Sequence, residues 1–182
     1  MFLDIAVAIV VVKLVSFSLH QELSVILLMF AICSSLFPDI DIISPATLKY
    51  FFKKQVVNHR TFLHYPALYI LPSLLLLTIS GKLAFIFSIC IFLHFVHDTF
   101  FLGWGVLWLW PFSSTRFKCF PDRDGKIVNL PLVTWKENEE KEIIKRYHNP
   151  DWVQDFYFKP NIVAYIEYGA LFLALMVLIF LW

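Results

Sequence analysis

His94 and Asp98 stand four residues apart near the end of an apolar run, with His97 between them. In a helix this spacing places the imidazole and the carboxylate on one face, one turn apart, where both can bind the same ion. His97 lies on nearly the same face and is predicted to be a further ligand or a group that supports the ligands. The alternative interpretation is a His–Asp hydrogen bond that only fixes neighbouring helices.

Two aspartates, Asp39 and Asp41, follow Pro38 where another apolar run ends. In an extended turn, side chains two residues apart point the same way, so both carboxylates could reach one metal centre. Aspartate after proline at a helix end is also ordinary turn chemistry. Taken alone, this motif does not separate the two interpretations.

A third polar cluster, residues 58–64, precedes the next apolar run. His59 and His64 are five residues apart, so joint ligation requires a helix start or a break between them, which Pro66 permits. Arg60 is a candidate phosphate clamp in catalysis, because a guanidinium binds oxyanions through two hydrogen bonds. It is equally well explained as one more positive residue beside a membrane helix.

The three clusters together predict a metal site. A mixed set of imidazoles and carboxylates suits Zn, with Mn or Fe(II) as alternatives, rather than an ion held by thiolates. More than four candidate ligands leave room for one ion or two. The 3 cysteines are widely separated and form no CxxC pair, so they are assigned no site.

Five apolar stretches must position these clusters, in a chain of 182 residues that is 59% hydrophobic. That composition exceeds what a soluble core needs, so the chain must face lipid. A span needs roughly 17–25 residues, and the second and third stretches are short. We expect an all-α fold, a polytopic membrane helix bundle with about five transmembrane helices and four as the fallback, at residues 2–19, 23–37, 65–79, 83–102 and 162–182.

Positive charge is sorted to one side of this predicted bundle. All 15 Lys and Arg residues except Lys13 and Lys82 fall in residues 49–60 and 116–159. With five spans these segments share a side, which the positive-inside rule makes cytoplasmic. The polar clusters lie at that face of a multi-pass inner (plasma) membrane protein, in contact with the lipid bilayer. A formal net charge of only +1 gives no reason to expect direct nucleic-acid binding.

The long segment before the last apolar stretch is expected to be a cytoplasmic loop with one helix. Thr134 and Glu137 match a capping box, and charged pairs four residues apart follow, which predicts a surface helix over 135–147. We therefore divide the chain into a membrane-embedded hydrolase-like core, a cytoplasmic segment with an interfacial helix that could bind a protein partner, and a C-terminal transmembrane helix, at 1–112, 113–160 and 161–182.

At the three clusters the sequence resembles the YdjM-like family, inner-membrane proteins described as LexA-binding and as metal-dependent hydrolases. Residues 36–41 look like the family's LxPDID block, 58–64 like its GHRGxTH block, and 93–111 like its HxxxD block with a following G…LWP run. The resemblance covers roughly residues 1–115. It implies a hydrolase-type metal site related in style to zinc-dependent phospholipase C, with six candidate ligands, Asp39, Asp41, His59, His64, His94 and Asp98.

The sequence departs from the family pattern near the second and first blocks. Thr61, Leu63 and Tyr65 replace the usual Gly, Thr and Ser, and Ile42 stands where a His often follows. The family's early histidine is also missing, and Asp4 stands near its place. Asp4 is therefore a candidate oxygen ligand, with a charge partner for the helix-start dipole as the alternative.

These observations predict a membrane-embedded, metal-dependent hydrolase that acts on a phosphoester or phosphodiester of a lipid or another membrane-resident substrate. Arg60 would position the anionic group, and His97 or a spare carboxylate would act as general base. The alternatives are a non-catalytic protein that uses the cluster for metal or proton transport or for structure, and a partner-binding membrane protein. Transport would spread polar groups through the bilayer depth, whereas these gather at one face.

Overall fold

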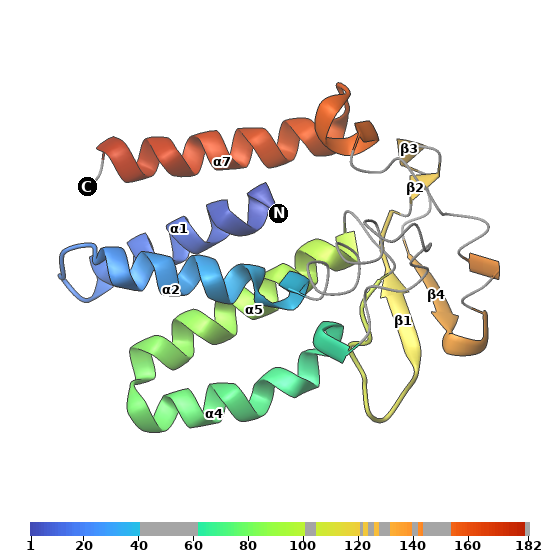
Figure 1. The fold of residues 1–182 in the computed structure, drawn as a ribbon, viewed down its shortest axis with the longest axis horizontal. Coiled ribbons are helices and arrows are strands. Elements are labelled where there is room, and N and C mark those ends of the chain that lie inside the picture. The colour runs from blue at the N-terminus through green and yellow to red at the C-terminus, as the bar shows by residue number, and fades with distance from the viewer. Residues whose placement is uncertain are drawn as a thin grey trace, which may run out of the picture.

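The structure is a computed structural model that describes residues 1–40, 62–100, 105–120, 122–123, 126–127, 132–139, 142–143 and 154–180. Within these ranges the chain is mostly helical, and its long helices lie roughly side by side (Figure 1). Each long helix falls within or close to one of the five apolar stretches. They are α1 (Phe2–Ser18), α2 (Val25–Leu36), α4 (Ile70–Ile79), α5 (Gly81–Phe100) and α7 (Ile162–Phe180).

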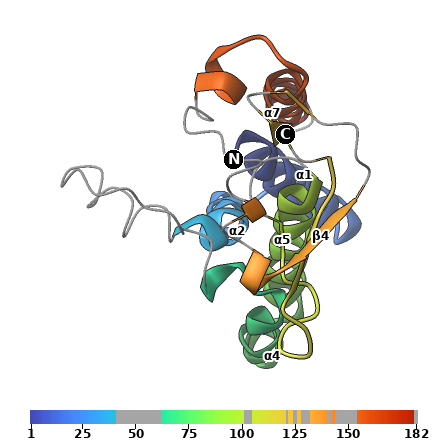
Figure 2. The same cartoon turned by 90° about the vertical axis from the view of Figure 1, so that its right-hand side faces the viewer.

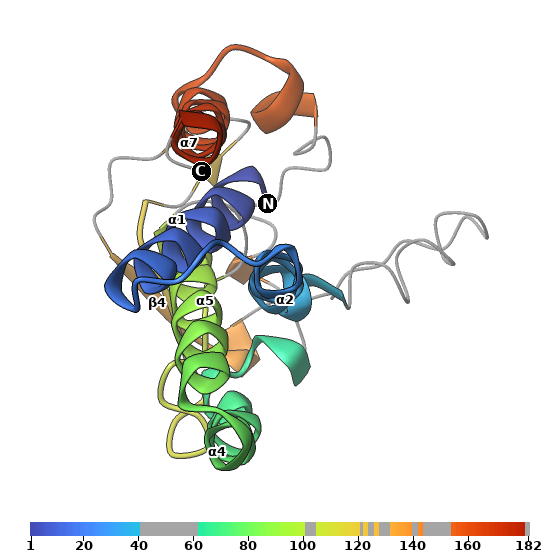
Figure 3. The ribbon, with the colours of Figure 1, turned by 90° about the vertical axis from the view of Figure 1, so that its left-hand side faces the viewer.

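The helices alternate in direction along the chain. Viewed along their axes, α7, α1, α5 and α4 follow one another across the molecule, and α2 lies beside α1 and α5 (Figure 3). The starts of α1, α4 and α7 and the ends of α2 and α5 therefore meet at one end of the bundle (Figure 1). This common end carries Asp39, His64, His94 and Asp98, which are the described members of the polar clusters.

Two of the described helices, α5 and α7, are long and apolar enough to cross a membrane. The apolar runs Val25–Asp39 and Pro66–Ile79 are shorter, below the roughly 20 residues that a full span needs. The predicted crossing of the membrane by all five helices stays a prediction.

α1 is the central helix of the bundle, because it packs against α2, α5 and α7. Small side chains on facing helices let the backbones approach closely. The contact of α1 with α2 and α5 is formed by the fully buried residues Ala8, Val12, Ala31, Ile86 and Cys90. A second cluster, Ala6, Ile9 and Ala174, brings α7 against the same helix.

Two small antiparallel sheets follow α5, and the all-α prediction did not include them. Strand β1 (Thr115–Lys118) pairs with β4 (Val133–Lys136), and β2 (Asp122–Arg123) pairs with β3 (Lys126–Ile127). Figure 2 looks onto the end of the molecule where these strands lie. The fold is therefore a helix bundle with a small β-structured segment at the end that carries His94 and Asp98.

Hydrogen bonds connect β1 and the residues next to it in sequence to the last turn of α5. The backbone N–H of Cys119 donates to the carbonyl of Thr99 at 2.7 Å. The indole N–H of Trp108 donates to the Thr99 hydroxyl at 2.9 Å. The Lys118 ammonium donates to the carbonyl of Asp98 at 3.1 Å. These contacts fix the turn of α5 that bears Asp98.

The predicted surface helix does not begin at Trp135, because Trp135 lies within β4 opposite Arg116 of β1. The capping-box pattern is local, and burial of the indole overrides it: Trp135 is 4% exposed while its strand neighbours point outward. A short 3-10 turn (Glu137–Glu139) follows, and Glu142 and Ile143 are helical. The remaining positions of the predicted helix lie outside the described residues.

Gly105 provides a test of how β1 is held. Its φ of +76° is in the left-handed region, and a Cβ there would lie 2.5 Å from the carbonyl oxygen of Phe117. We expect Gly105→Ala to lower the free energy of unfolding by about 2 kcal/mol or more. Thermal unfolding of the purified protein in detergent measures this.

The matched control is Gly169→Ala in α7, where a new Cβ meets no atom within 4 Å. Its effect should stay within about 1 kcal/mol, because alanine is the better helix former. Equal effects of the two substitutions would show that the close contact between Gly105 and β1 does not limit stability.

Candidate metal centre

Four ligand-type side chains converge at the common end of the bundle. One atom from each of Asp39, His64, His94 and Asp98 lies within 4.8 Å of the corresponding atom of every other. Three of these side chains are buried, and Asp39 is 21% exposed. The group therefore has a closed interior and one more open side, at Asp39.

Short 3-10 turns place the first two residues of this group. Pro38 lies in the first turn of η1 (Phe37–Asp39), which continues directly from the end of α2 and brings Asp39 inward. His64 ends η3 (Phe62–His64), and the hydroxyl of Tyr69 donates to the Leu63 carbonyl at 2.8 Å. Proline at the start of a helix and a hydrogen bond across the next turn thus fix both side chains.

The helix α5 supplies the other two residues, His94 and Asp98, one turn apart. The Nε2 atom of His94 lies 3.5 Å from Oδ2 of Asp98 and 3.8 Å from Oδ1 of Asp39. As the spacing predicted, the imidazole and the carboxylate lie on one face of the helix. His94 and Asp98 therefore face Asp39 and His64, which the 3-10 turns supply.

The four atoms lie close enough together to bind one ion. The Nε2 atom of His64 lies 3.3 Å from Oδ2 of Asp98 and 3.5 Å from Oδ1 of Asp39. Metal–ligand bonds of about 2.0–2.2 Å give a tetrahedron with edges of roughly 3.4 Å. Charge-assisted hydrogen bonds would be shorter, at about 2.7–2.9 Å. Separations of 3.3–3.8 Å between each imidazole and the two carboxylates are therefore compatible with ligands that share one ion.

Asp4 lies outside this group of four, on the other edge of the His94 ring. Its Oδ1 atom is 3.3 Å from Nδ1 of His94. It is also 3.0 Å from Nδ1 of His97. Asp4, which the sequence offered as an oxygen ligand, is thus placed to accept from the two histidine rings.

His97 faces carboxylates on both sides rather than the group of four. Its Nδ1 lies against Asp4, and its Nε2 is 3.2 Å from Oε1 of Glu167. The ring is 7% exposed. This position suits the supporting role that the sequence left open for His97.

Glu167 is a site residue that the sequence reasoning missed. It is fully buried in α7 and accepts from the backbone N–H groups of Phe2 at 2.8 Å and Leu3 at 3.2 Å. The hydroxyl of Tyr157 donates to it at 3.2 Å. A signal was present, because Glu167 is the one charged residue of the apolar run 162–182 and ionisable groups at membrane depth usually mark function.

The groups around Glu167 favour its ionised form. Burial, followed by the neighbouring carboxylate of Glu167, raises the pKa of Tyr157 above its ordinary value. Tyr157 is therefore a neutral phenol that donates. The amino group of Met1 lies 3.3 Å from Oε2 of Glu167 and 2.9 Å from Oδ2 of Asp4.

Lys118 is a second residue that the sequence reasoning did not single out. It is 1% exposed, and its ammonium reaches the carbonyl of Asp98. A buried cation thus stands beside the four-residue group. Three predicted site residues, Asp41, His59 and Arg60, lie outside the described residues.

The comparison with protein families gives a match over nearly the whole chain. The family of YdjM inner membrane proteins matches residues 3–182, which extends the resemblance from the three polar clusters through β1 and β4 to α7. No curated protein and no solved structure matches the chain significantly. The match covers the residues of the metal centre and Glu167 alike, and the chain belongs to the YdjM inner membrane protein family.

Proposed function

We propose that this protein is a membrane-embedded, metal-dependent hydrolase that acts on a phosphoester or phosphodiester of a membrane lipid at the cytoplasmic face. The observation that carries the proposal is the convergence of two imidazoles and two carboxylates, with one ligand atom from each within 4.8 Å of the others. A mixed set of nitrogen and oxygen donors favours Zn, with Mn or Fe as alternatives.

A divalent ion in this site would take up water as a fifth ligand beside the four side chains, and would supply a water nucleophile at neutral pH and positive charge beside a phosphoryl oxygen. His64, His94 and Asp98 hold the closed side of the site, where water is excluded. Asp39, with its greater exposure, stands at the side from which a head group enters. The buried ammonium of Lys118 adds positive charge near the same centre, and Arg60 is assigned to the anionic group of the substrate.

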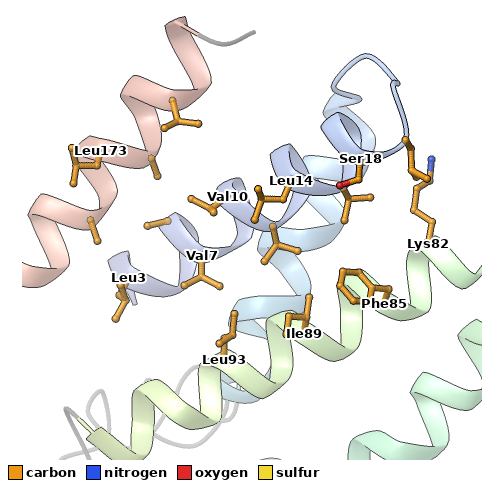
Figure 4. Close-up of a pocket in the computed structure, with 17 residues that line it drawn as sticks. Leu3, Val7, Val10, Leu14, Ser18, Lys82, Phe85, Ile89, Leu93 and Leu173 are labelled. Carbon is orange, nitrogen blue, oxygen red and sulfur yellow. The ribbon is translucent and has the colours of Figure 1, made fainter.

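An apolar groove between α1, α5 and α7 supports a lipid as the substrate (Figure 4). Its volume is about 840 Å³. It begins at Leu3 and Leu93, the chain neighbours of Asp4 and His94, and ends at Ser18 and Lys82. The groove therefore runs toward the end of the bundle that carries the metal centre.

The groove is long enough to hold one acyl chain of a lipid. From Leu93 to Lys82 the helix α5 rises roughly 16 Å, and half of a hydrocarbon core about 30 Å thick is about 15 Å. The lining is apolar except at Ser18 and Lys82. We assign the groove to one acyl chain of the substrate lipid, whose head group then lies at the end that carries the metal centre.

The catalytic proposal predicts metal-dependent hydrolysis by the purified protein. Release of product from phospholipid in mixed micelles should stop with a chelator and return with Zn or Mn. The rate should fall by at least about a hundredfold in His94→Ala and Asp98→Ala, because the water loses its activating ion. His20→Ala, which changes an exposed histidine at the opposite end of α1, serves as the control. Hydrolysis that is indifferent to chelation would contradict the assignment.

The groove assignment predicts a chain-length effect. Leu14→Trp adds bulk within the groove and should raise KM for a long-chain lipid by about tenfold, the cost of displacing roughly two methylene groups. KM for a short-chain analogue should not change. The control is Leu75→Trp in α4, since Leu75 is 58% exposed and Leu14 is 59% exposed. If the two variants respond alike, or both substrates are affected equally, the chain does not lie in this groove.

A further inference from the structure

Four buried side chains alternate between carboxylate and imidazole and form a continuous chain across the bundle, from Glu167 through His97 and Asp4 to His94. Successive contacts measure 3.2 Å from Glu167 Oε1 to His97 Nε2, 3.0 Å from His97 Nδ1 to Asp4 Oδ1, and 3.3 Å from Asp4 Oδ1 to His94 Nδ1. This series of contacts connects α7, α5 and α1 and ends at His94, a residue of the metal centre.

The last contact determines which nitrogen of His94 is available to a metal. A carboxylate that accepts the Nδ1 proton leaves Nε2 with its lone pair, and Nε2 is the atom that faces Asp98 and Asp39. Asp4 thus fixes both the tautomer and the orientation of the His94 ring. His97 in turn orients Asp4, because the Nδ1 atom of His97 lies within 3.1 Å of both Asp4 oxygens.

Glu167 is held in place at the start of this series of contacts. Its Oε2 accepts from two backbone N–H groups at the start of α1, and its Oε1 accepts from Tyr157. The positive end of a helix macrodipole adds to the hold on a carboxylate in that place. With both oxygens engaged at the start of α1 and at Tyr157, Glu167 can orient His97 with little motion of its own.

We propose that Glu167 is a positioning residue of the metal centre, acting through His97 and Asp4 on the ring of His94. The inference rests on the proposed metal-dependent function. It gives α7 a role beyond membrane anchoring, because a residue of the last helix then sets the metal affinity of a site formed by η1, η3 and α5. It also assigns His97 to orientation of the site, in place of a general base.

The experiment measures Zn affinity of the purified full-length protein by competition with a chromophoric chelator, without substrate. Glu167→Gln keeps the shape of the side chain and an oxygen that can accept from α1, so the fold should persist. Zn affinity should fall by about 10–100-fold, as when the partner of a metal-bound histidine is lost. Glu22→Gln, an exposed residue in the loop between α1 and α2, should have no effect.

A double-mutant cycle separates positioning from a general structural role. Asp4→Asn should also weaken Zn binding, and Asp4→Asn with Glu167→Gln should cost little more than the larger single effect, because both act through His94. In the wild type, the ¹⁵N spectrum of His94 should show protonated Nδ1, and Glu167→Gln should mix the two tautomers. Unchanged Zn affinity in Glu167→Gln, with only a lower Tm, would overturn the inference and leave Glu167 as a tie between α7 and α1.

The two proposals fail in different ways. A wild-type protein that binds Zn through His94 but hydrolyses no phosphoester contradicts the hydrolase and leaves the positioning role in place. A hydrolase whose metal affinity ignores Glu167→Gln retains its function and loses the positioning role. A wild-type protein that binds no divalent metal overturns both.

Discussion

The free-energy cost of burying ionisable groups is the main constraint on this structure. An isolated carboxylate or imidazolium in an apolar bundle is expensive, so such groups persist only where they face partners or an ion. Asp4, His64, His94, Asp98 and Glu167 are each almost fully buried. They all lie where helices start or end at the same end of the bundle, so their mutual contacts fix the ends of α1, α5 and α7. The small residues along α1 then allow the helices to approach closely enough for those contacts.

Much of this arrangement could be predicted from the sequence. Apolar stretches separated by short polar clusters located the long helices, because period and length are properties of a segment alone. Alternation of helix direction then brought Asp39, His64, His94 and Asp98 to one end. The i, i+4 spacing of the last two is also a local property. Family membership followed from the same blocks, and the family match runs through the whole chain.

Contacts between residues far apart in the sequence account for the features that were not predicted. Trp135 enters a strand because β1 is available to pair with it and bury its ring, which no capping pattern can reveal. Glu167 is a single charge in a long apolar run, and its partners are the start of α1 and His97, far away in sequence. The position of Asp4 also depends on tertiary contacts. A ligand and a residue that orients a ligand look identical in sequence, and only the side of the His94 ring on which they lie separates them.

X-ray absorption spectroscopy of the Zn-loaded protein tests the central claim most directly. The account predicts nitrogen and oxygen neighbours at about 2.0–2.2 Å and an imidazole contribution that decreases in His64→Ala but not in His97→Ala. A sulfur neighbour near 2.3 Å, as a thiolate would give, would contradict it. So would an imidazole contribution that is unchanged in His64→Ala, since the metal would then lie away from the end of the bundle where Asp39, His64, His94 and Asp98 meet.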